Sequence, residues 1–219
     1  SISAGVGSIS QSGNTLTIQQ TTPQLAINWG SFNIGSQAGV IFQQPSTSAS
    51  ALNRINSTSP SVINGSLQAN GQILLLNPSG VIFGQSARVD VGGLIASSLS
   101  LGDADYLAGK YNFTSNGSPG LINNQGTLVA HDGGYILLLA PQVQNSGTIQ
   151  SPNGQINFSA GQSVSVALEP EGLLNVEVDA AVINALVQNT GAIKAEGGVV
   201  QLSAQALNTL TSGALNQTV

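Results

Sequence analysis

Carboxylates are the acid–base groups that this sequence supplies in greatest number, and there are nine of them. Hydrolysis of a sugar chain by general acid and base needs two carboxylates about 5–9.5 Å apart. The nine are scattered, and Asp103 and Asp105, which could share one face of a strand, lie in an expected loop. The full set is Asp90, Asp103, Asp105, Asp132, Glu169, Glu171, Glu177, Asp179 and Glu196. We therefore expect no catalytic residues, and a polysaccharide-degrading enzyme is the least favoured function.

The single histidine, His131, stands beside Asp132. Adjacent residues of a strand point to opposite faces, so a corner turn fits this pair better than a catalytic dyad. Without cysteine and with one histidine, a transition metal lacks ligands. Calcium could find oxygen ligands at Glu169 and Glu171, but a solvated hairpin tip is the favoured interpretation. The sequence predicts neither a metal nor a cofactor.

The overall composition excludes several classes of protein. Charged residues make up 6% and the net charge is −5, whereas nucleic-acid binding needs a basic face. No apolar run reaches the roughly 20 residues of a membrane span. Hydrophobic residues make up 41% and alternate regularly, which argues against disorder. The absence of cysteine suits a protein that crosses an oxidising space, and the first residues fit either a cytosolic protein or one whose signal peptide has been removed.

An internal repeat of 21–22 residues organises the second half of the chain. Each copy reads apolar-x-Asn-x-Gly, has a second glycine seven residues later, and continues with an alternating strand that ends in alanine. The asparagines are Asn124, Asn145 and Asn189, and the first glycines are Gly126, Gly147 and Gly191. The glycine steps are 21 and 44 residues, the second being a doubled step. A degenerate copy follows at Ser212-Gly213, and a similar unit opens upstream at Ile63.

This period, with short alternating strands and Gly/Asn corners, is typical of one solenoid coil per repeat. Leucine-rich repeats are excluded by their different leucine spacing, and an antiparallel sandwich would need hairpin turns every 8–12 residues. We predict an all-β fold, a right-handed parallel β-helix in which coils stack about 4.8 Å apart. Asn124, Asn145 and Asn189 should form a corner ladder of bonded amides, where asparagine also tolerates left-handed backbone.

Three segments depart from the repeat. Residues 164–180 are typical of a β-hairpin with its turn at 169–172, and residues 103–120 form a second excursion outside the helix. Residues 1–60 lack the repeat and are predicted to form an N-terminal β cap, with strands at 6–10 and 15–19. Trp29, Phe32 and Ile34 should cover the open end of the core. The coils then occupy 61–219, and 1–219 forms a single domain.

The densest local motif is Leu76-Asn77-Pro78-Ser79-Gly80-Val81-Ile82-Phe83-Gly84. Asn77 to Gly80 predict a β-turn in which Pro78 presets φ, Asn77 caps the turn and Gly80 permits the exit conformation. Other segments accompany this motif in a fixed order: Ala26–Gly35, Ala51–Ile55, Gly65–Gly71, Val91–Ser98, Gly133–Ile136 and Ala140–Val143.

This ordered set resembles the N-terminal secretion domain of two-partner-secretion exoproteins, the filamentous-haemagglutinin and high-molecular-weight-adhesin family of Gram-negative bacteria. The resemblance covers essentially the whole chain. It is greater to the high-molecular-weight-adhesin branch, because the Asn-x-Asn-Leu motif of the other branch is absent. Where the family has Asn-Pro-Asn-Gly, this chain has Ser79 at the third position, a conservative change for a turn.

The resemblance implies a non-enzymatic secretion signal that also nucleates folding of a large exported adhesin. Its implied partner is the outer-membrane transporter, whose polypeptide-transport-associated (POTRA) domains recognise it in the periplasm, and Asn77, Pro78, Ser79 and Gly80 are the recognition or folding motif. The implied protein is a monomer, is secreted or held at the cell surface after signal-peptide removal, and binds neither nucleic acid nor membrane. Direct binding of a host glycan or surface is the alternative function.

Overall fold

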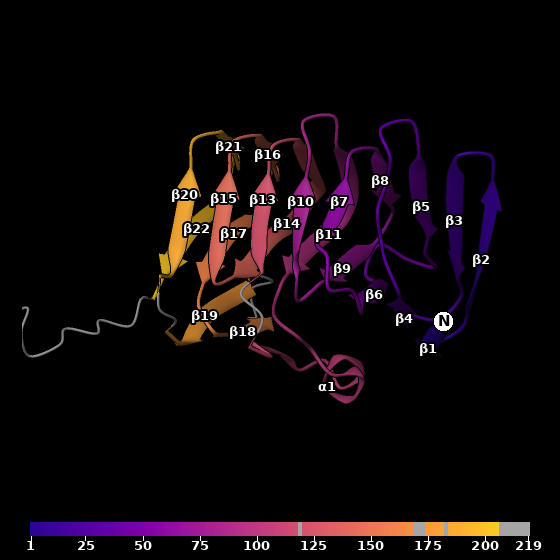
Figure 1. The fold of residues 1–219 in the computed structure, drawn as a ribbon, viewed down its shortest axis with the longest axis horizontal. Helices are drawn as coiled ribbons and strands as arrows, with labels where there is room; N and C mark the ends of the chain where they lie inside the picture. Colours follow the sequence, from indigo (N-terminus) through magenta and orange to yellow (C-terminus); the bar gives the residue numbers. More distant parts are fainter. Residues whose placement is uncertain (118–119, 169–173, 182–183, 206–219) are drawn as a thin grey trace, which may run out of the picture.

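A computed structural model describes residues 1–117, 120–168, 174–181 and 184–205. The chain winds as a parallel β-helix whose coils follow one another along its long axis (Figure 1). Three ladders of parallel strands form its faces, and the predicted all-β parallel β-helix is confirmed. Each ladder runs in the order of the sequence, because every coil adds one strand to it.

The first ladder contains the strand that opens each coil: β3 (Thr15–Gln20), β5 (Gly39–Gln43), β8 (Ser66–Ala69), the first part of β11 (Arg88–Ser97), the first part of β14 (Thr127–Ala140), β16 (Thr148–Gln150) and β21 (Ala192–Lys194). The second ladder contains β4 (Gln24–Trp29), β6 (Ser50–Ile55), β9 (Gln72–Leu76), the second parts of β11 and β14, β17 (Gln155–Ala160) and β22 (Val199–Ala204). The third contains β7 (Ser61–Ile63), β10 (Gly80–Phe83), β13 (Leu121–Asn124), β15 (Gln142–Asn145) and β20 (Leu186–Asn189).

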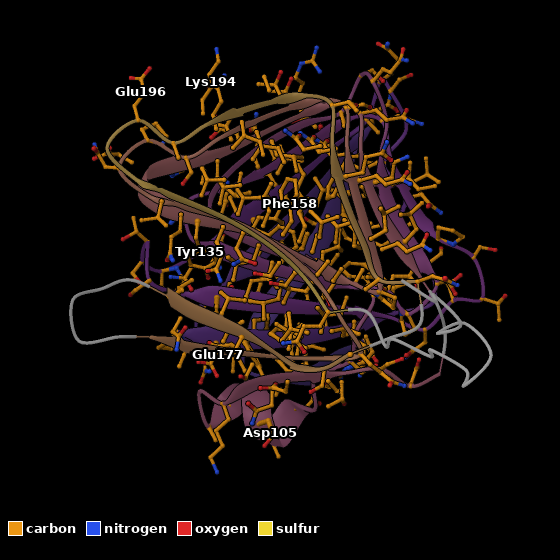
Figure 2. All side chains as sticks on the ribbon, turned by 90° about the vertical axis from the view of Figure 1, so that its left-hand side faces the viewer. Asp105, Tyr135, Phe158, Glu177, Lys194 and Glu196 are labelled. Atoms are coloured by element: carbon orange, nitrogen blue, oxygen red, sulfur yellow. The ribbon has the colours of Figure 1, made fainter. Side chains whose placement is uncertain are left out.

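The register of these ladders follows the sequence period. Leu128 pairs with Ile149, and Ile149 pairs with Ile193 in the next coil. The doubled step between Gly147 and Gly191 therefore holds one coil and an excursion. Side chains alternate along the strands, so one set fills the interior with aliphatic and aromatic groups. Figure 2 looks along the helix and shows Phe158 in this interior, while Lys194 and Glu196 point outward.

The outer side of the second ladder is also buried, which produces a second apolar core. Its outward residues Leu52, Leu74, Ile95 and Leu137 are apolar, so these strands read as continuous hydrophobic runs. Both excursions pack here: the short helix α1 (Asp103–Leu107), and an antiparallel sheet of β12 (Tyr111–Thr114), β18 (Ser163–Leu168) and β19 (Leu174–Ala180). The expected hairpin turn and the copy at Ser212-Gly213 lie outside the described residues.

The cap is shorter than the sequence predicts. Only β1 (Ile2–Ala4) and β2 (Gly7–Ser12) pair antiparallel with the first coil, and parallel pairing begins at Thr15 instead of residue 61. The early coils start at Thr15, Gly39 and Ser66, a wider spacing than the later repeat. Longer loops between their strands stretch the period, and this conceals the coils in the sequence.

Candidate functional site

The motif Asn77 to Gly80 forms the corner between β9 and β10. The amide of Gly80 donates to the carbonyl of Asn77 at 2.8 Å, and the amide of Ser79 donates to Asn77 Oδ1 at 3.0 Å. Gly80 has φ +106°, and a Cβ there would lie 2.5 Å from the carbonyl oxygen of Leu121. The left-handed backbone and this close approach both require glycine at the exit of the turn.

Asn77 joins this corner to two other coils from a fully buried position. Its Nδ2 donates to the carbonyl of Ser59 and to Ser61 Oγ, both at 3.1 Å. Its backbone amide donates to the carbonyl of Ser97 at 3.0 Å. Ser79 adds a side-chain bond, because its Oγ donates to the carbonyl of Ser57 at 2.9 Å. The folded motif thus connects three neighbouring coils, and the Asn77 side chain is not accessible at the surface.

The aromatic residues expected to cover the core lie in the first coil. The rings of Trp29 and Phe32 meet edge to face at 5.3 Å, and Phe32 and Ile34 are buried. Ile34 bridges Ile63, so it occupies a third-ladder position and does not lie beyond the coils. Trp29 Nε1 donates to Oδ1 of Asn53, an amide inside the core that was not singled out from the sequence. The one feature of the sequence that points to Asn53 is its place in the motif segment Ala51–Ile55.

The repeated asparagines stack at the end of the third ladder. Asn124 Nδ2 donates to Asn145 Oδ1, and Asn145 Nδ2 donates to Asn189 Oδ1, both at 2.7 Å. Asn124 and Asn145 are buried. The left-handed backbone expected at this corner is absent from these three, because among the described residues only Asn153 and Asn184 combine positive φ with a side chain. The shared bonds between coils suffice to favour asparagine here.

The segment expected as a loop around Asp103 contains α1, which packs back over the first two coils. Arg54 Nη1 lies 2.7 Å from Asp103 Oδ1, and Arg54 Nη2 donates to the carbonyl of Leu101 at 2.6 Å. Tyr106 is fully buried, and its hydroxyl lies 2.7 Å from Ser50 Oγ. Burial raises the pKa of Tyr106 to about 12, and the hydrogen bond with Ser50 opposes that rise. The phenol is therefore neutral at ordinary pH.

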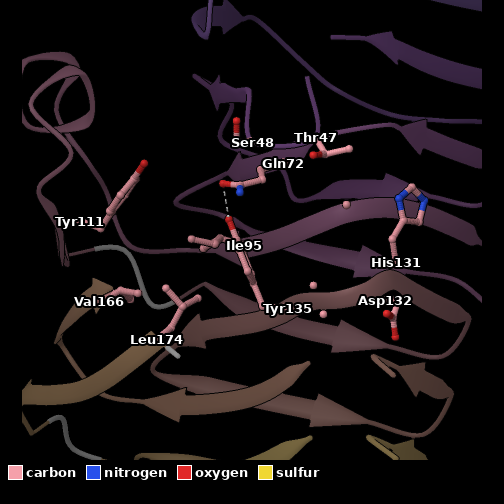
Figure 3. Close-up of a pocket in the computed structure, with 13 residues that line it drawn as sticks. Thr47, Ser48, Gln72, Ile95, Tyr111, His131, Asp132, Tyr135, Val166 and Leu174 are labelled. Atoms are coloured by element: carbon pink, nitrogen blue, oxygen red, sulfur yellow. Dashed lines mark hydrogen bonds between the residues drawn. The ribbon is translucent and has the colours of Figure 1, made fainter. Parts of the chain in front are cut away.

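A cleft of about 620 Å³ lies between part of the outer side of the second ladder and part of the antiparallel sheet (Figure 3). Tyr135 lies at its centre, and the Tyr135 hydroxyl donates to Gln72 Oε1 at 2.9 Å. Burial raises the pKa values of Tyr111 and Tyr135. The lining residues are Thr47, Ser48, Gln72, Gly92, Ile95, Tyr111, His131, Asp132, Gly133, Gly134, Tyr135, Val166 and Leu174. Both phenols are neutral hydrogen-bonding groups here.

The structure does not pair His131 with Asp132. His131 Nε2 lies 2.9 Å from Asp90 Oδ1 of the preceding coil, and Asp132 Oδ1 accepts from Asn153 Nδ2 at 2.7 Å. Among the described residues, Asp132 is the one carboxylate that lines the cleft. Within the described ranges, no three metal-ligating side chains gather to hold an ion, and no helix has the length and hydropathy of a membrane span. Glu169 and Glu171 lie outside those ranges.

A capped parallel β-helix with an extra-helical sheet and an Asn-Pro corner defines a solenoid scaffold. The chain belongs to the TPS secretion domain family, which it matches over residues 2–219. This is a family of exoprotein secretion domains and not an enzyme family. The resemblance inferred from the ordered motifs is confirmed.

Similar proteins come from Haemophilus influenzae. The crystal structure of the HMW1 secretion domain superposes with a TM-score of 0.81 at 27% identity, over 93% of this chain and 56% of that one. A heme/hemopexin-binding protein is 33% identical over 95% of this chain, and a second one is 40% identical over 45%. The chain spans 23% and 11% of these two relatives, so their names describe much longer proteins.

Proposed function

We propose that this chain is the secretion signal of a larger exported adhesin, recognised in the periplasm by the POTRA domains of an outer-membrane transporter. After export, it starts the folding of the exoprotein at the cell surface or in the medium. Membership of the TPS secretion domain family carries this proposal. The absence of cysteine and the low charge are compatible with threading an unfolded chain through a pore.

Recognition of Asn77 and Pro78 takes place in the extended chain and not in the folded domain. The supporting observation is that Asn77 is fully buried once the β-helix has formed. In the unfolded chain, Pro78 biases Asn77 toward extended backbone. An extended segment can add as a strand to the edge of a partner sheet, which supplies main-chain hydrogen bonds. The same residues then form the corner junction after export.

The last described coil supports a role in templating the rest of the exoprotein. Val200 and Leu202 occupy the register positions that follow Ile156 and Phe158 of the core, yet they are 46% and 48% exposed. A further coil stacked on β22 would bury these side chains and pair its backbone. Each added coil supplies the same surface to the next, so the β-helix can grow without an external energy source.

The decisive experiment separates recognition of the motif from stability of the folded domain. Asn77→Ala is compared with Asn145→Asp, which lies in the asparagine ladder outside the motif and also weakens the fold. Each variant is studied at a temperature where the same fraction of its molecules is folded. Secretion and co-purification with the transporter's periplasmic domains are measured for both. We expect Asn77→Ala to reduce both readouts at least fivefold relative to Asn145→Asp. Equal secretion and equal binding for the two variants would overturn recognition of this motif.

A further inference from the structure

The ring of Tyr135 lies flat on the outer surface of the β-helix. Tyr135 pairs with Gly93, and Gly93 pairs with Gln72, so the phenol crosses Gly93 to reach the Gln72 amide. A Cβ on Gly93 would stand 2.8–3.1 Å from three atoms of the ring. Glycine at this position therefore lets one face of the ring rest on the backbone. The other face of this half-buried ring belongs to the cleft in Figure 3.

The remaining walls of the cleft divide into apolar and polar sides. Ile95, Val166 and Leu174 line it beside the antiparallel sheet. Thr47 and Ser48 face them from the loop before β6, and the rim carries His131 and Asp132. The cleft therefore combines the aromatic ring of Tyr135 with hydroxyl and amide groups that both donate and accept hydrogen bonds. The volume of about 620 Å³ suits a small ligand of one or two rings.

The charged groups in the described lining of the cleft do not favour an anionic ligand. Among the lining residues that the structure describes there is no lysine or arginine, and Asp132 is the one carboxylate. Asp90 stands just outside, paired with His131. The Asp132 carboxylate is already bonded to Asn153, which leaves less of it to balance a ligand ammonium. A neutral ligand with many hydroxyl groups matches this lining better than a cation does.

We propose that this cleft binds one or two units of a neutral saccharide. The polarised C–H face of a pyranose ring packs on the negative π face of Tyr135. The hydroxyl groups of the saccharide bond to Gln72, Thr47 and Ser48, which line the cleft together with Tyr135. This binding site goes beyond transporter recognition and uses none of the residues of the Asn77 corner, so either proposal can fail without the other.

The test uses the ¹⁵N-labelled domain, residues 1–219, titrated with lactose, maltose and N,N′-diacetylchitobiose. Glucosamine and N-acetylneuraminic acid serve as cationic and anionic probes. We expect at least one neutral probe to produce saturable shifts of the Gly92, Gly133 and Gly134 amides. An absence of saturable shifts with all neutral probes at about 50 mM, well above a millimolar Kd, would overturn the proposal. Tighter binding of glucosamine would instead assign the cleft to amines and would also overturn it.

Three variants locate the response. Thr47→Trp fills the cleft from an exposed loop position, and Gly93→Ala lifts the Tyr135 ring from its seat. Each should weaken binding at least tenfold while the amide spectrum stays dispersed. Gln37→Trp, on an exposed turn away from the cleft lining, is the matched control and should leave affinity unchanged. Unchanged binding in both cleft variants would overturn the assignment of the site.

Discussion

The hydroxyl of Tyr106 lies 2.7 Å from Oγ of Ser50, although 56 residues separate them in the chain. Tyr106 lies on α1, which leaves the β-helix after β11, and Ser50 opens β6 in an earlier coil. The same hydroxyl also lies 2.9 Å from the carbonyl oxygen of Ser50 and 3.3 Å from that of Leu25, and these two acceptors share its one proton. The excursion that contains α1 thereby contacts coils formed by earlier parts of the chain. This contact forms only when those coils are in place.

Tyr106→Phe should lower the free energy of unfolding by about 1–2 kcal/mol, because Ser50 Oγ loses a buried partner. Urea unfolding followed by circular dichroism measures the change. Ser50→Ala and the double variant complete a double-mutant cycle, in which we expect a coupling energy of about 1 kcal/mol. Strictly additive effects of the two single variants would contradict a direct bond between these side chains.

Alkaline pH should weaken the fold through Tyr106. Its folded pKa, about 12, lies above the ordinary value of 10.0, so the folded state keeps a proton that the unfolded state loses. The stabilisation is complete below pH 10 and declines as pH rises toward 12, by about 2–3 kcal/mol in total. Urea midpoints at pH 9, 10 and 11 measure this decline. The stability of Tyr106→Phe should fall less over this pH range, and the remaining fall comes from Tyr111 and Tyr135, whose pKa values are also raised. An equal fall in the variant and the unchanged domain would exclude Tyr106 as a source.

The asparagine ladder should tolerate no carboxylate. In Asn145→Asp, the new side chain still accepts from Asn124 Nδ2 but cannot donate to Asn189 Oδ1 while ionised. We expect a loss of about 2–4 kcal/mol at pH 7, with partial recovery in acid, where a protonated carboxyl can donate. Thermal unfolding at pH 4 and 7 measures both. Gln144→Glu, the outward neighbour on the same strand, should change stability by less than about 0.5 kcal/mol.

Local repetition explains what the sequence could predict. The copies around Asn124, Asn145 and Asn189 share one internal pattern although they lie 21 and 44 residues apart. Stacking of similar coils places equivalent residues together, so the shared pattern specifies their register. The hairpin of β18 and β19 was predictable because its alternation is local. The Asn77 turn was predictable from Pro78 and Gly80, whose backbone preferences hold without tertiary context.

Contacts without a local pattern could not be predicted. No periodicity links Tyr106 to Ser50, because Tyr106 lies within an excursion and not in a coil. The same excursion separates Asp90 from His131, and its length does not follow the repeat. Asn53 faces the core of the β-helix, where a polar residue interrupts the alternation of apolar and polar residues. Its role becomes clear only from the tertiary structure, in which Trp29 donates a hydrogen bond to it. The cleft depends on how the antiparallel sheet docks on Tyr135, and that docking is a tertiary arrangement which binary patterning does not encode.

Asn157 offers a route to a more stable domain. It continues the outward row from Leu137, lies 1% exposed, and its Nδ2 has no hydrogen-bond partner within the part of the chain that the structure describes. Its Oδ1 accepts from the buried Ser159 hydroxyl at 2.6 Å. Removing one group leaves the other unsatisfied, whereas replacing both with apolar side chains is neutral or stabilising.

Asn157→Leu combined with Ser159→Ala should therefore raise the free energy of unfolding by up to about 2 kcal/mol, since an orphan donor is removed and the leucine row is extended. The corresponding rise in Tm is about 2–8 °C for a chain of this length. Asn157→Leu alone should fall below the double variant, because the Ser159 hydroxyl then lacks its acceptor. Calorimetry of the unchanged domain and the two variants orders them, and a double variant less stable than the unchanged domain would show that the Asn157 amide bonds to water or to chain beyond the described residues.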